Sequence, residues 1–169
     1  MADVNPFQQV YEGLWTLLNA NAALVALIPD SGNQINYDGT VSNPEKRAIQ
    51  PADLPELRII MSPGGQLWNA RTTNGSSYSQ RFEIQISTGE KGLTSLFEVE
   101  WETLRALADW KSVFGTMTWG GEEFVKYCLV TEIASQSLNN EELNREQPGW
   151  STIWAGEVQM WFTTEALKP

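Results

Sequence analysis

The spacing of apolar residues changes once between Ser77 and Trp110, from every second residue to about every 3.6 residues. In the first half, apolar and polar residues alternate, which predicts a strand with one buried face and one solvated face. The expected buried set is Tyr78, Phe82, Ile84 and Ile86, and the expected solvated set is Ser79, Arg81, Glu83, Gln85 and Ser87. This strand limits the fold to architectures that cover a single face of a sheet.

A helix is expected directly after this strand. Ser95 is placed to cap its first turn, and Glu98, three residues later, completes the pattern of a capping box. The expected apolar stripe of the helix consists of Leu96, Phe97, Trp101, Leu104, Leu107 and Ala108. A strand that buries one face, followed by a helix that buries one face, predicts an α+β layer.

Two further helices are expected at the start of the chain. Asn5-Pro6 is a helix start, and Gln8 falls at the capping-box position. The helical stripe that follows is Phe7, Val10, Tyr11, Leu14, Leu17 and Leu18. A second, shorter helix is expected from Asn21 to Ile28, with Asn21 as its cap.

The remaining segments predict strands separated by two long loops. Strands are expected at 35–37, at 57–61 with Arg58 and Ser62 on the solvated side, at 116–119, at 124–133 and at 150–163. Gly120-Gly121 predicts a tight hairpin, and Val158, Met160 and Phe162 are expected to point inward. The expected architecture is a single α+β domain over 1–169. Its sheet is mostly antiparallel, with about four to five strands packed against one long helix and one or two shorter ones.

Composition argues against several classes of function. The net charge is −10, and the eleven basic residues are scattered, which disfavours binding to phosphates. The chain contains no His, the commonest general base and metal ligand. Cys128 is the single cysteine, so no intrachain disulfide or Cys-based zinc site is expected, and a reducing cytoplasm is the best match. Neither a signal peptide nor a membrane span is expected.

The carboxylates do not predict a catalytic site. Glu98, Glu100 and Glu102 are two residues apart on the expected helix and therefore point in different directions. Pro63-Gly64-Gly65-Gln66 lacks the Lys and Ser/Thr of a phosphate loop, and no calcium-loop spacing of acidic residues occurs. We expect no enzymatic activity, no cofactor and no metal.

Eight Trp residues instead indicate contact surfaces, because Trp is favoured in cores and at protein interfaces. Trp15, Trp101, Trp110, Trp154 and Trp161 are expected in the core or at subunit contacts. Trp68 and Trp150 border the polar loops 64–76 and 135–149 and are expected to be half exposed, although a carbohydrate-binding surface is an alternative. The predicted contact residues for a subunit or tail tube are Trp68, Asn69, Arg71, Leu138, Leu143, Arg145 and Trp150.

The order of the expected elements, together with two stretches of sequence, resembles the tail terminator (tail completion) proteins of long-tailed bacteriophages. The stretches are 15–24 (WTLLNANAAL) and 81–89 (RFEIQISTG). The resemblance implies a homo-oligomeric ring, a hexamer, which caps the tail tube, stops its polymerisation and joins it to the head connector. DNA would pass through the channel without specific binding.

The same resemblance implies a place in the virion, at the tail end or neck, after assembly in the host cytoplasm and without contact with a membrane. A contractile and a non-contractile tail both remain open. A head-tail connector subunit (adaptor or stopper) is the nearest alternative, and a carbohydrate-binding module or a small His-free hydrolase is more distant.

Overall fold

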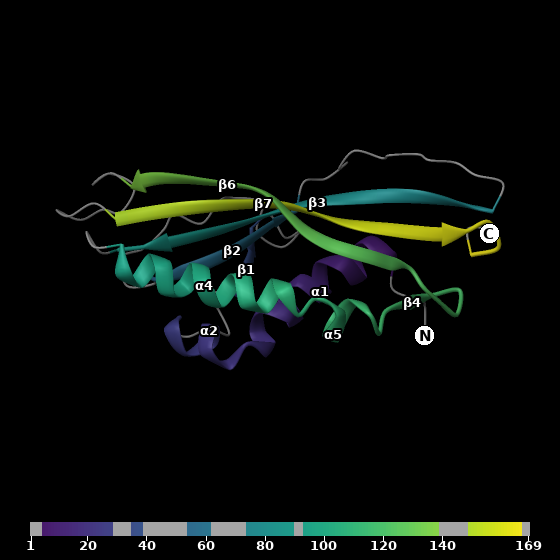
Figure 1. Ribbon diagram of the computed structural model, residues 1–169, viewed down its shortest axis with the longest axis horizontal. Helices are drawn as coiled ribbons and strands as arrows, with labels where there is room; N and C mark the ends of the chain where they lie inside the picture. Colours follow the sequence, from purple (N-terminus) through teal and green to yellow (C-terminus); the bar gives the residue numbers. More distant parts are fainter. Residues whose placement is uncertain are drawn as a thin grey trace.

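The sheet is long and curved, and the helices cover one of its faces (Figure 1). The fold is known from a computed structural model that describes residues 5–28, 35–38, 54–61, 74–89, 93–138 and 149–166. Five strands lie in the order β1-β2-β3-β7-β6; β1 is parallel to β2 and every other pair is antiparallel. The predicted α+β class with a mostly antiparallel sheet is confirmed. The strands are β1 (Ile35–Asp38), β2 (Glu56–Met61), β3 (Gly75–Thr88), β6 (Val125–Leu138) and β7 (Gly149–Thr163).

Four helices are described: α1 (Pro6–Ala20), α2 (Ala22–Leu27), α4 (Thr94–Ala108) and α5 (Lys111–Phe114). The Oδ1 atom of Asn5 accepts a hydrogen bond of 2.9 Å from the backbone N–H of Phe7, so the predicted start of α1 is confirmed. The predicted capping role of Gln8 is wrong, because its Nε2 donates along the helix to Glu12 Oε1 at 2.8 Å. Phe7, expected in the buried stripe, is 41% exposed because it lies in the first turn.

Asn21 connects three helices. Its Oδ1 atom accepts hydrogen bonds from the N–H groups of Ala23 and Leu24, both at 3.0 Å, and so caps α2 as predicted. Its Nδ2 donates to the backbone oxygen of Glu102 in α4, at 3.0 Å. Since α1 ends at the residue before Asn21, this one side chain fixes where α1, α2 and α4 meet.

The core lies between the sheet and the helices. Strands β3 and β7 pair along their whole length, from Gly75 opposite Thr163 to Thr88 opposite Trp150. Phe82 lies opposite Gly156, where a Cβ atom would collide with the Phe82 ring. The predicted inward sets are confirmed, because Tyr78 is half-buried and packs against the core, where its ring contacts Phe162. The buried core-lining residues of these two strands are Phe82, Ile84, Ile86, Trp154, Val158, Met160 and Phe162.

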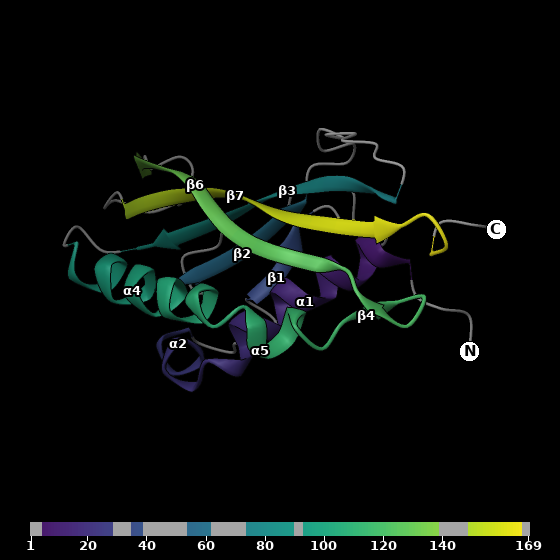
Figure 2. The ribbon, with the colours of Figure 1, turned by 45° about the vertical axis from the view of Figure 1, so that its right-hand side comes forward.

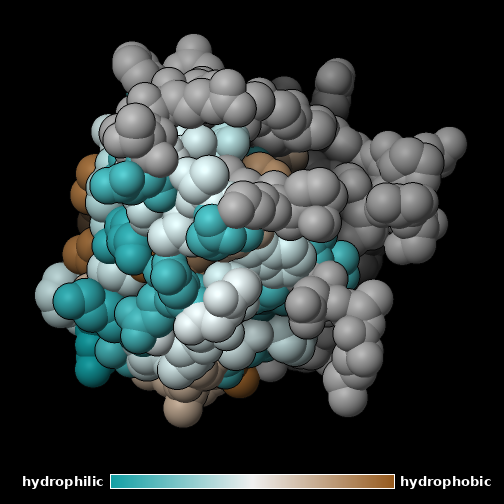
Figure 3. All heavy atoms as spheres, turned by 90° about the vertical axis from the view of Figure 1, so that its right-hand side faces the viewer, coloured by the Kyte–Doolittle hydropathy of each residue, from teal (hydrophilic) through white to brown (hydrophobic). Residues whose placement is uncertain are grey.

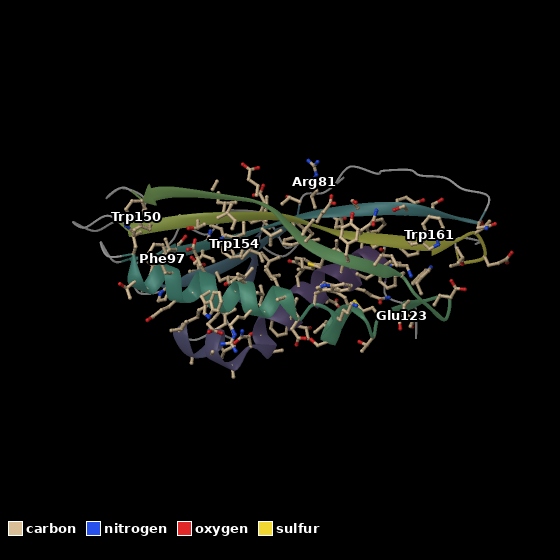
Figure 4. All side chains as sticks on the ribbon, in the orientation of Figure 1. Arg81, Phe97, Glu123, Trp150, Trp154 and Trp161 are labelled. Atoms are coloured by element: carbon tan, nitrogen blue, oxygen red, sulfur yellow. The ribbon has the colours of Figure 1, made fainter. Side chains whose placement is uncertain are left out.

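The opposite face of the sheet is less solvated than predicted. Ser79 and Ser87 are buried, and Ser87 Oγ donates to Ser151 Oγ at 3.3 Å. On β2, Arg58 is buried rather than solvated, and its Nε lies 2.9 Å from Glu56 Oε1, which is also buried. Alternation along a strand separates the two faces of a sheet, but it does not tell how much of the polar face is covered. Arg81 remains exposed and projects away from the helices (Figure 4).

The predicted hairpin forms only at its tip. Gly120 and Gly121 have φ angles of 60° and 83°, the positive values that a tight turn requires. They join β4 (Thr118–Trp119) to β5 (Glu122–Glu123), which form a separate two-stranded sheet. The longer arm that follows becomes β6 and pairs with β7, and it extends to Leu138 rather than ending at Ile133.

Candidate interaction surface

Helix α4 presents apolar residues on two sides. One side packs into the core through Leu96, Val99, Ala106 and Leu107, together with the fully buried Thr103. The other side is exposed: Leu93 by 37%, Phe97 by 57%, Trp101 by 60% and Leu104 by 43%. The predicted stripe was therefore wrong for Phe97, Trp101 and Leu104, and also for Ala108, which is exposed.

The four large exposed residues form one row, which we call the α4 flank (Leu93, Phe97, Trp101 and Leu104). They are spaced by four, four and three residues, which places them on one side of a helix with 3.6 residues per turn. On the same helix, the Glu102 side chain faces the opposite direction, and its Oε2 accepts a hydrogen bond of 3.3 Å from Asn21 Nδ2 just before α2. The α4 flank is therefore directed away from α2.

The start of α4 differs from the prediction. The helix begins at Thr94, with Leu93 in the N-cap position and no side-chain hydrogen bond at the cap. Ser95 lies inside the first turn, so the predicted capping box of Ser95 and Glu98 does not form. A large apolar residue thus occupies the position where a capping side chain is usual. Leu93 lacks the stabilising hydrogen bond of a capping side chain, and it extends the α4 flank by one turn.

Strand β6 forms one edge of the sheet and lies on the same side of the molecule as α4 in both ribbon views (Figures 1 and 2). Ile133 is 54% exposed, and it pairs with Trp154, whose side chain is buried on the helix-facing side. Leu129 is 52% exposed and pairs with Glu157, which belongs to the other face. A bulge between Val130 and Glu132 changes the alternation, so Ile133 and Leu129 point to opposite faces.

The α4 flank is uncharged, although the chain as a whole is acidic. Its nearest ionic residues on α4 are Glu98, Glu100 and Arg105, and Glu100 lies one turn from both Phe97 and Leu104. Arg105 Nη1 is 2.9 Å from Glu102 Oε1, so its charge is compensated within the helix. Figure 3, an end-on view, shows a mostly polar face with hydrophobic atoms mainly at its margins.

The predicted contact residues fall largely outside the described part of the chain. Trp68, Asn69, Arg71, Leu143 and Arg145 are not among the described residues. The backbone of Leu138 is not in a loop, because it pairs with Gly149 at the end of β6. Trp150 is half-buried, as expected, and packs against the core at the end of the sheet where Phe97 also lies (Figure 4). Their roles in contacts remain predictions.

Sequence reasoning missed the α4 flank, although a signal was present. Apolar residues in α4 and just before it occupy far more than one stripe: Leu93, Leu96, Phe97, Val99, Trp101, Leu104, Ala106, Leu107 and Ala108. A helix that covers one face of a sheet needs an apolar arc of only about 100° or slightly more. The excess over that arc indicates a second apolar surface.

The described residues offer little for catalysis. Among them, no group of three or more Asp, Glu or Cys side chains could hold a metal ion. Burial raises the pKa of the Cys128 thiol to about 12, so it is protonated and unreactive near neutral pH. The pKa of Tyr127 is also raised, first by burial and then by Glu157, whose Oε1 accepts a 3.4 Å hydrogen bond from the phenol. Both shifts disfavour a nucleophile or base.

No helix within the described ranges is long and apolar enough to cross a membrane.

No protein-family model matches the sequence, and no curated protein sequence matches it. The fold is similar to that of a solved structure described as the virion of a native gene transfer agent (GTA) particle. The TM-score is 0.54 with 13% sequence identity, over 88% of this chain and 92% of that chain. The similarity establishes a shared fold across most of both chains.

Proposed function

We propose that this chain is a structural virion protein of a long-tailed phage or phage-like particle. Copies form a ring, a hexamer, that caps the tail tube, terminates its polymerisation and joins it to the head connector. The observation that carries the proposal is the α4 flank. A chain that leaves this much apolar surface in water is suited to assembly, because exposed patches of this kind mark sites of protein association.

Two further observations support a structural role. The fold is shared with a chain of a virion particle, and that similarity extends over 88% of this chain. The net charge of −10 also suits a conduit for DNA, because a surface with an acidic excess repels phosphates and lets the duplex slide. Neither a metal nor a cofactor is needed for such a role.

Electron microscopy of tail tubes tests the proposal. The purified full-length protein is added while tail tube protein polymerises, and tube lengths and tube ends are recorded. We expect shorter tubes with ring-shaped density at one end. Tubes of unchanged length with bare ends would contradict the proposal, and rings found on head connectors but never on tubes would favour the connector alternative.

A further inference from the structure

The α4 flank is an exposed apolar surface at the side of the molecule. Phe97 and Trp101 are each more than half exposed. Since an aromatic side chain can bury about 150–250 Å², each leaves on the order of 100 Å² in water. With Leu93 and Leu104, the exposed apolar area is on the order of 400 Å², within the range of the largest patch that a monomer carries, and such patches are often functional.

We propose that this surface binds a second copy of this chain, through a different surface of that copy, and that repetition of the contact closes the ring. The inference rests on the proposed function, which requires a ring. A contact of one surface with itself stops at two copies, whereas a contact between two different surfaces generates a ring when the rotation between copies closes and an open filament when it does not. The α4 flank is thus one half of each subunit contact.

The area agrees with a subunit contact. A standard interface buries about 800 Å² per partner, with an apolar centre and a polar rim. The α4 flank would supply about half of that area as its apolar centre. Glu98 and Arg105 at the border of α4 would belong to the rim.

The centre of the α4 flank carries no charge, which suits a contact between two acidic copies. Two chains that each carry a net charge of −10 repel each other, so their contact is least costly where neither sign dominates. The α4 flank meets this condition at its uncharged centre, whereas Glu98 and Glu100 outnumber Arg105 at its border.

The contact uses side chains rather than a shared strand ladder. The edge strand β6 has irregularities between Val125 and Tyr127 and between Val130 and Glu132. Bulges of this kind interrupt the row of backbone groups and protect an edge from continuous strand pairing. The bulge near Val130 also turns Ile133 toward the helix side of the sheet.

Sedimentation velocity of the full-length protein tests the inference. We compare the wild type, the Phe97→Ser/Trp101→Ser variant, and a control, Phe7→Ser, which removes an aromatic residue that is 41% exposed on α1. The wild type and the control should form the same closed species, and the double variant should remain a monomer, with association weakened at least 100-fold. Circular dichroism should show that all three are folded, and Trp101→Gln alone should give an intermediate loss.

Several results would overturn the inference. If the double variant forms the same ring as the wild type, the surface is wrong while the ring function stands. If Phe7→Ser disrupts assembly equally, the contact is not specific to the α4 flank. If the wild type stays monomeric both alone and with tail tubes, the inference and the proposed function fail together.

A mixing experiment tests that the contact joins two different surfaces. A fluorescently labelled double variant keeps the other half of the contact, so it should sediment with the wild type and reduce the yield of closed rings. A labelled variant that never sediments with the wild type would indicate that the flank binds itself, and would contradict the proposed geometry.

Discussion

Helices α1 and α4 are each 15 residues long and pack against each other beneath the same sheet, yet they use their apolar residues differently. In α1, the central apolar residues Val10, Leu14, Leu17 and Leu18 are at most 2% exposed. In α4, a buried row is accompanied by a second row that the fold leaves uncovered. The comparison shows that packing against the core accounts for the apolar residues of a helix only as far as the core can bury them. Apolar residues beyond that area indicate a contact with another molecule.

The largest effect is expected from a matched pair of Leu→Ala changes in the two helices. Leu14 is fully buried, and its truncation should lower the free energy of unfolding by about 2–5 kcal/mol, because it removes buried methyl groups and leaves a cavity. Leu104 is 43% exposed, so its truncation to Ala should lower the free energy of unfolding of the monomer by about 1 kcal/mol or less. Urea unfolding at low protein concentration, where association does not contribute, measures both. Equal losses would show that the α4 flank belongs to the core of the monomer.

The connection between the helices should be the next most sensitive position. Asn21→Ala removes the cap of α2 and the hydrogen bond to Glu102, and should cost about 1–2 kcal/mol in chemical unfolding. Asn5→Ala is the control, since Asn5 caps α1 but makes no described contact with another helix. A loss at Asn21 no larger than that at Asn5 would contradict its role in connecting α1, α2 and α4.

A third prediction compares two positions on β6, since Cys128 is half-buried against the core whereas Ile133 is 54% exposed. The folded pKa of Cys128, about 12, lies above its ordinary value of 9.0, so the folded state binds the proton more tightly. The stabilisation is therefore complete below pH 9 and declines above it, by about 1 kcal/mol at pH 10. Unfolding curves at pH 8 and pH 10 should show a smaller decline for Cys128→Ala. An identical decline in both proteins would indicate that Cys128 is not enclosed.

The smallest effect is expected at Thr152, whose buried Oγ1 has no hydrogen-bond partner among the described residues. Thr152→Val removes the unsatisfied hydroxyl and keeps the shape, so stability should stay equal or rise by about 1 kcal/mol. The matched change Thr103→Val in α4 removes a hydroxyl that donates to Val99 O at 2.7 Å, and should be less favourable. Thermal unfolding of both variants measures the difference, and a clear loss at Thr152 would reveal a partner for its hydroxyl.

Features that depend on neighbouring residues in the sequence could be predicted. The caps at Asn5 and Asn21, the positive φ angles at Gly120 and Gly121, and the inward set of β7 follow from local chemistry and periodicity. The α+β class follows from the change of period between β3 and α4. The extension of β6 could not be predicted, because the polar residues after Ile133 join the strand only through pairing with β7.

The candidate site could not be predicted for a related reason. Whether Phe97 and Trp101 face the core or the solvent depends on how α4 is rotated about its axis, and the sheet and the Asn21 contact determine that rotation. Burial of Ser79, Ser87 and Arg58 likewise depends on what covers the second face of the sheet. Periodicity identifies two faces of an element, but only the tertiary structure shows which of them is covered.

Native mass spectrometry of the wild-type protein tests the central claim most directly, namely that the uncovered α4 flank is a subunit contact in a closed ring. The account predicts one dominant oligomer, a hexamer of the 19.0 kDa chain, which keeps the same stoichiometry as the protein concentration rises. A monomer at every concentration, or a continuous series of sizes without a preferred copy number, would contradict it.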